Sequence, residues 1–121
     1  MIKKMEIAGV HMDVEPKLQK YVTKKLGAMD KYIPRAARES AHLEVKLKEV
    51  STKDKRDYTC EVILFLPHDR IRIAETTVNI FAAVDIIETK LKNQIRKYKQ
   101  THANKRLPAR IAAKIRSHSR P

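Results

Sequence analysis

The chain has 121 residues, enough for one domain and too few for two. Hydrophobic residues make up 42% of it, so we expect a packed core that needs no disulfide or structural metal. Lysine and arginine total 27 against 14 acidic residues, a formal net charge of +13. This charge indicates a polyanionic partner, either nucleic acid or, less often, an anionic membrane.

Two features of the sequence indicate in which cellular compartment the protein works. Cys60 is the only cysteine, so no internal disulfide can form, which fits a reducing environment. The N-terminus has no apolar run of signal-peptide length, and no segment approaches the roughly 20 apolar residues that span a bilayer. We therefore expect a cytoplasmic protein without a membrane anchor.

A strand and a helix come first along the chain. Residues 2–10 alternate between apolar and polar side chains and predict a short strand. Pro16 fits the first position of a helix that Glu15 caps and Pro34 ends, and Gly27 inside it costs about 1 kcal/mol relative to alanine. The apolar stripe of this helix consists of Leu18, Val22, Leu26 and Met29.

Three more strands are predicted next. Residues 41–50 alternate clearly, residues 51–57 read as a hairpin loop, and strands at 58–66 and 70–78 are separated by the turn at 67–69. The short loops predict an antiparallel meander. The first strand reaches the second through a helix, so we expect that pair to be parallel, with a right-handed crossover.

A long second helix is predicted from Asn79, which can act as its N-cap, to about Gln100. Its apolar stripe consists of Ile80, Val84, Ile87, Leu91, Ile95 and Tyr98. On a helical projection, one flank of this stripe holds Lys92, Arg96 and Lys99, and the other holds Lys90 and Lys97. The helix should therefore pack its stripe on the sheet and present cations on both sides.

The β-α-β-β-β-α order predicts an α+β fold, in which a four-stranded mixed sheet carries both helices on one face. The charge is uneven, since residues 79–121 carry 11 basic and 2 acidic groups, whereas residues 1–78 carry 16 and 12. Residues 101–121 contain no acid and no clear apolar face, so we expect a mobile basic tail after a domain at 1–100.

The lysines of the two helices predict a joint basic surface that suits phosphate groups. The alternative is that each lysine is an ordinary solvated residue of its helix. This alternative is stronger for any single lysine than for all the cations of the second helix and the tail taken together. Membrane binding would need an exposed apolar face, but here that face is required to cover the sheet. Strand 58–66 lacks the aromatic motif of an RNA-recognition sheet, which favours recognition of phosphates and shape over base stacking.

No catalytic, cofactor or metal site is predicted. Two glycines cannot build a phosphate-binding loop, and the five histidines have no metal-ligand spacing with Cys60. The adjacent His68 and Asp69 are read as turn residues, and Cys60 as part of the core. No nucleophile has a base and an orienting group, so we expect neither an enzyme nor a small-molecule substrate.

The second helix, residues 79–85 (NIFAAVD) and 90–99 (KLKNQIRKYK), resembles the signature of the ribosome hibernation promoting factor family. This family is also called the ribosome-associated inhibitor (YfiA) or sigma-54 modulation protein family. Further likeness lies in residues 21–26 (YVTKKL), 29–32 (MDKY) and 58–78, and the match covers residues 3–100.

The resemblance implies a layout similar to that of a double-stranded-RNA-binding domain. It also implies binding to the 30S subunit at the decoding region, where the protein would block mRNA and tRNA in idle ribosomes, as in stationary phase or stress. The partner would be 16S rRNA. The family's basic positions fall on Lys25, Lys31, Lys90 and Lys97, with Lys24, Lys92, Arg96 and Lys99 as neighbours on the same surfaces.

The chain departs from the family pattern at three places. Asn79 stands where an acid is usual, and Asn93 stands where an arginine is frequent, with Lys92 beside it as a substitute. A basic tail ends at Pro121, where long members continue into a dimerising domain, so we expect a short form that is monomeric off the ribosome. Two alternatives stay open: a general double-stranded RNA-binding protein, and a protein-protein regulator of a sigma factor.

Overall fold

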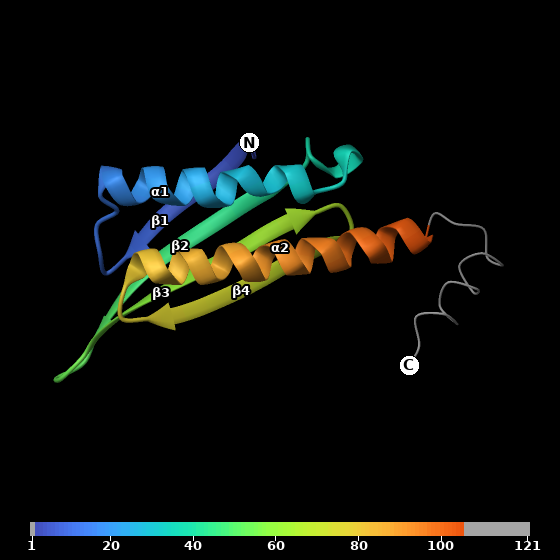
Figure 1. Cartoon of the computed structure of the whole chain (residues 1–121). Coiled ribbons are helices and arrows are strands. Elements are labelled where there is room, and N and C mark those ends of the chain that lie inside the picture. Colours follow the sequence, from blue (N-terminus) through green and yellow to red (C-terminus); the bar gives the residue numbers. More distant parts are fainter. Residues whose placement is uncertain (1, 106–121) are drawn as a thin grey trace, which may run out of the picture.

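The structure is a computed structural model that describes residues 2–105. Its elements follow the predicted order (Figure 1). The strands are β1 (Lys4–Val10), β2 (His42–Ser51), β3 (Arg56–Leu66) and β4 (Asp69–Thr77). The helices are α1 (Pro16–Gly27) and α2 (Ile80–Lys105), with two short 3-10 helices, η1 (Ala28–Tyr32) and η2 (Arg35–Ala37), after α1.

The four strands form one sheet in the order β1-β2-β3-β4. β1 pairs with β2 in parallel, whereas β2 with β3 and β3 with β4 pair antiparallel. The predicted mixed sheet is therefore confirmed. The parallel pair arises because α1 separates β1 from β2, while short turns join the other strands.

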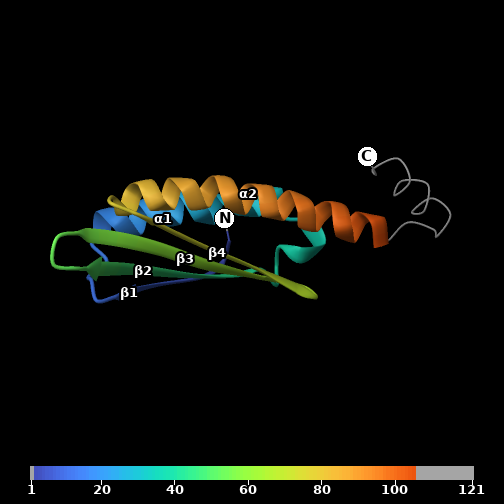
Figure 2. The same ribbon diagram turned by 90° about the horizontal axis from the view of Figure 1, so that it is seen from below.

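Both helices lie over the same face of the sheet, as Figure 2 shows in side view. The alternation of β2 makes this possible, because Leu43, Val45 and Leu47 are almost completely buried while Lys46 and Lys48 between and beyond them are exposed. From the helix side the core is closed by Val22 and Leu26 of α1 and by Val84, Ile87, Leu91 and Ile95 of α2. No helix of residues 2–105 lies on the opposite face of the sheet (Figure 2).

The first helix differs from its prediction at both ends. The Glu15 side chain makes no capping hydrogen bond, and it is the Glu15 carbonyl that accepts the Gln19 N–H at 2.9 Å. α1 also ends at Gly27, well before Pro34. Gly27 has the low helix propensity of its type, and the chain continues from it into the tighter 3-10 turns of η1.

The second helix begins where it was predicted and ends later. The Asn79 side-chain oxygen accepts the Phe81 N–H at 2.9 Å, which confirms Asn79 as the N-cap. α2 runs to Lys105, so the prediction that it ends at about Gln100 was too short. The rest of the predicted tail, residues 106–121, lies outside the described residues.

Candidate nucleic-acid interface

The two long helices lie side by side and are held together near the start of α2 (Figure 1). The ring of Tyr21 on α1 packs edge-on against Phe81 of α2, with centroids 5.0 Å apart. The Tyr21 hydroxyl donates a hydrogen bond to the Asp85 carboxylate, and this bond raises the pKa of Tyr21 to about 12. These contacts fix which flank of α2 faces α1.

That flank continues along α2 and brings cations from two elements together. Lys31 of η1 lies over the ring of Tyr32, with its ammonium 5.2 Å from the ring centroid. Lys92 of α2 approaches the same ring at 4.9 Å. The hydrogen bond from Lys92 and the charges of Lys31 and Lys92 lower the pKa of Tyr32, because they stabilise its phenolate form.

A groove of about 310 Å³ separates η1 from this flank of α2. We call it the Tyr32 groove and define it by Lys31, Tyr32, Glu88, Lys92, Asn93 and Arg96, all of which line it. Three of these six side chains are cationic and one is acidic. Lys99 is exposed one helical turn beyond Arg96, on the same flank.

The other flank of α2 faces β4, as the helical projection predicts. Lys90 pairs there with Glu75 of β4, with 2.6 Å between the ammonium nitrogen and the carboxylate oxygen. Lys97 lines a separate hollow of about 350 Å³ with Arg70 and Arg72 of β4. The guanidinium of Arg72 contacts Glu61 at 2.9 Å. Neither arginine was among the predicted site residues, because the strand pattern alone gives no signal that β4 lies beside α2.

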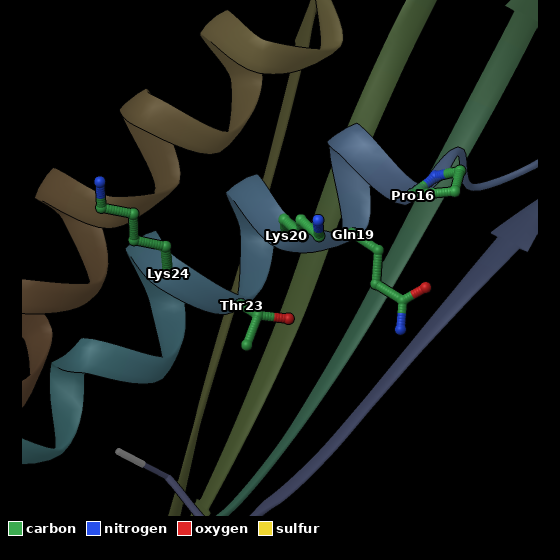
Figure 3. A pocket seen from close by; sticks show the side chains of 5 residues that line it. All are labelled: Pro16, Gln19, Lys20, Thr23 and Lys24. Carbon is green, nitrogen blue, oxygen red and sulfur yellow. The ribbon is translucent and has the colours of Figure 1, made fainter.

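The predicted lysines of α1 occupy two different surroundings. Lys25 lies 3.8 Å from Glu88 and 4.0 Å from Asp85, so it faces acids of α2. Lys24 is exposed and lines a hollow of about 410 Å³ on α1 with Pro16, Gln19, Lys20 and Thr23 (Figure 3). The structure thus groups Lys31, Lys92 and Arg96, and places Lys24, Lys90 and Lys97 elsewhere.

Two of the predicted cations, Lys25 and Lys90, have acidic neighbours. Asp85 and Glu88 approach Lys25, and Glu75 pairs with Lys90. The helical projection places Asp85 and Glu88 on the flank of Lys92, so they could have been found. Glu75 could not, since its contact depends on how α2 packs on β4.

Two further groups bear on the chemistry. Cys60 is fully buried, and burial raises the pKa of its thiol to about 12, in keeping with the predicted core position. On the open face of the sheet, the β1–β2 pairing brings Glu6, His42 and Glu44 together. One carboxylate oxygen of each glutamate and one imidazole nitrogen of His42 lie within 4.8 Å of one another. This cluster lies away from the helices and escaped the search for metal-ligand spacing, because its members are far apart in sequence.

Within residues 2–105, neither helix has an apolar stretch long enough to span a bilayer.

Comparison with known proteins gives consistent results for sequence and fold. The family model described as "Sigma 54 modulation protein / S30EA ribosomal protein" matches residues 5–103. The "Ribosome hibernation promotion factor" of Staphylococcus aureus (strain COL) is 28% identical over 96 residues. The alignment covers 79% of this chain and 48% of that protein, so the chain spans about half the length of this curated relative.

Two solved structures share the fold. The N-terminal domain of Thermus thermophilus Protein Y matches with a TM-score of 0.60 at 22% identity, covering 77% of this chain and 94% of that one. A ribosomal subunit interface protein from Coxiella burnetii matches with a TM-score of 0.65 at 21% identity, covering 80% of this chain and 98% of that one. The α+β architecture is therefore the one seen in these proteins.

Proposed function

Because the chain belongs to the Sigma 54 modulation protein / S30EA ribosomal protein family, we propose that it is a ribosome hibernation factor. It binds the decoding region of the small subunit, where it occupies the space of mRNA and tRNA and so inhibits translation in idle ribosomes. The observation that carries this proposal is the convergence of Lys31, Lys92 and Arg96 on one groove, within the region that matches the family.

The contacts are made with 16S rRNA phosphates. Lysine and arginine side chains from η1 and α2 supply point charges and a planar guanidinium, both suited to phosphate oxygens. The proposed surface comprises Lys24, Lys25, Lys31, Lys90, Lys92, Arg96, Lys97 and Lys99. Binding of this kind is steric and electrostatic, so the proposal assigns no reaction. A protein that acts on ribosomes works in the cytoplasm.

The direct test is cosedimentation with purified 30S subunits at low salt. Lys90, Lys92, Arg96 and Lys97 are changed together to glutamate, and the loss of binding is measured. The matched control reverses Lys46 and Lys48, two exposed lysines of β2 on the opposite face of the sheet. We expect the first variant to lose binding and the control to keep it. The proposal fails if the wild-type protein ignores 30S particles yet binds any RNA duplex.

A general double-stranded RNA-binding protein remains the alternative within RNA recognition. Such a protein would bind a free duplex about as tightly as it binds the subunit. A protein-protein regulator is a second alternative, because none of the described helices covers the open face of the sheet, which leaves it available to a protein partner (Figure 2). The reversal of the α2 cations separates the two classes, since it removes RNA binding but spares a contact made by the sheet.

A further inference from the structure

We infer that the Tyr32 groove is a phosphate subsite for one nucleotide of non-helical RNA, in which Tyr32 acts as a positioning residue. This inference rests on the proposed function. It states that the cations of the proposed surface contribute unequally to the affinity for RNA. Lys31, Lys92 and Arg96 bind the phosphate directly. Tyr32 acts through the two lysines that it holds.

The first support is the shared ring. Lys31 and Lys92 come from different elements, yet their ammonium groups lie 5.2 Å and 4.9 Å from the centroid of Tyr32. The ring attracts each ammonium through its negative face, whereas the two ammonium groups repel each other. A phosphate that contacts both lysines would offset their like charges. Arg96 follows Lys92 by one helical turn and lines the same groove.

The second support is the contrast with the other predicted cations. Lys90 already contacts a carboxylate at 2.6 Å, and Lys25 faces two of them at 3.8 and 4.0 Å. A phosphate at Lys90 or Lys25 has to compete with these carboxylates. At the Tyr32 groove the observed partner of Lys92 is the Tyr32 side chain, which is a weaker competitor for an ammonium group than a carboxylate in direct contact. The groove should therefore contribute more to affinity than Lys90 does.

The groove contains one acid, Glu88, and its surroundings explain how a phosphate is tolerated. Lys25 lies 3.8 Å from Glu88 and offsets its charge. Lys25 thus serves the groove as a second positioning residue, by neutralising the group that would repel the ligand. Substituting Glu88 with glutamine removes the repulsion outright and should strengthen RNA binding.

The size of the groove sets the class of ligand. About 310 Å³ lies at the lower limit of small-molecule pockets, a size that suits a single nucleotide. The Asn93 amide also lines the groove and offers both a donor and an acceptor to a base or ribose. Outside duplexes, the bases of RNA can be splayed out, so their edges are open to hydrogen bonds from such a group.

The test measures the affinity for 30S subunits at several salt concentrations. We expect Lys92→Gln to weaken binding by about tenfold or more, since one charged contact is lost. It should also reduce the slope of log K against log salt by about 0.7 to 0.9. Lys90→Gln, the matched control on the other flank of α2, should have a clearly smaller effect. Glu88→Gln should bind more tightly than the wild type.

The role of Tyr32 is tested by substitution with and without an aromatic ring. Tyr32→Phe and Tyr32→Trp keep the face that attracts the two ammonium groups and should retain affinity. Tyr32→Leu keeps an apolar side chain and should lose affinity and salt dependence together. Thermal unfolding of each variant shows whether the fold is intact. Should Tyr32→Leu unfold, the comparison of Lys92→Gln, Lys90→Gln and Glu88→Gln decides the inference.

The result that would overturn the inference is equal weakening by Lys92→Gln and Lys90→Gln, with no gain from Glu88→Gln. The proposed function would survive that result, since the wild type would still bind the subunit through a diffuse surface. Absence of wild-type binding to 30S particles would instead reject the proposed function. Hexauridylate then serves as the probe of the groove, and an unchanged affinity in Lys92→Gln would reject the inference as well.

Discussion

At the scale of single residues, the contact between Tyr21 and Asp85 decides how the two helices meet. Tyr21 is a half-buried residue at the edge of the core, and it offers α2 both an aromatic edge and a hydroxyl. The ring packs on Phe81 and the hydroxyl binds Asp85 one turn later. Because both partners lie on the same flank of α2, the pair of contacts sets the rotation of that helix relative to α1.

The hydrogen bond to Asp85 predicts an unusual titration of Tyr21. Its folded pKa of about 12 is higher than the ordinary value of 10.0, so the contact stabilises the fold fully below pH 10. This contribution is lost as the pH rises through 12. Asp85→Asn should return the pKa of Tyr21 towards 10, as measured by the ultraviolet absorbance of tyrosinate with Tyr21→Phe as the reference. An unchanged titration curve in Asp85→Asn would contradict the assignment.

The thiol of Cys60 gives a second prediction at this scale. Burial raises its pKa to about 12, so the reactive thiolate is scarce at pH 8. Ellman's reagent should therefore label the folded protein very slowly and the guanidinium-unfolded protein at once. The experiment compares the rate of thiol labelling in the folded and the unfolded protein. Fast labelling of the folded protein would show that Cys60 is accessible.

At the scale of elements, the ends of the helices depend on short-range contacts, and only some of these contacts can be predicted from the sequence. Asn79 caps α2 with its side chain, but Glu15 does not cap α1. The shorter asparagine side chain favours the return hydrogen bond to the second helical N–H, and such residues lead the N-cap preference. The 3-10 continuation after Gly27 then places Lys31 and Tyr32 opposite the middle of α2.

The cap predicts a measurable loss of stability. Asn79→Ala should lower the free energy of unfolding by about 1 kcal/mol, because the N–H of Phe81 loses its partner. Chemical denaturation followed by circular dichroism measures the difference. Asn93→Ala is the matched control, since Asn93 is exposed in the interior of the same helix, where alanine has the higher helix propensity, so this substitution should not lower the stability. Equal effects of the two substitutions would argue against a role for the cap.

At the scale of the whole molecule, the charged side chains of residues 2–105 are distributed between two faces. The helical face carries the predicted RNA-binding cations, and the open face mixes lysines with Glu6, Glu44 and Glu61. Acids paired with Lys25 and Lys90 reduce the local excess at the start of α2. Among the described residues, the positive charge of the helical face is therefore concentrated along the second half of that helix, around Arg96, Lys97 and Lys99.

This distribution predicts a steep dependence of subunit binding on salt. Six to eight phosphate contacts give a slope of about −4 to −7 for log K against log salt. Removal of residues 106–121, which hold only basic charges, should make the slope shallower without abolishing binding at low salt. Titration of 30S subunits with both chains over a range of potassium chloride concentrations measures the two slopes. A shallow slope for the full chain would point to a contact that does not depend on phosphates.

Local periodicity is what made much of this fold predictable. The alternation of residues 41–50 and the stripe from Ile80 to Tyr98 each report which side of their own element is buried. Chain order and loop length then suffice for the parallel and antiparallel pairs. The two flanks of α2 were correctly predicted for the same reason, because helical geometry relates residues within a few turns.

The sequence by itself therefore determined the element order, the buried faces and the presence of cations on both sides of α2. Only the tertiary structure decided which cations have acidic partners and which share the ring of Tyr32. Lys31 and Lys92, or Lys90 and Glu75, meet because of how separate elements rotate and pack against one another. That rotation depends on contacts such as those of Tyr21 with Phe81 and Asp85, which join residues about sixty positions apart and leave no periodic trace in the chain.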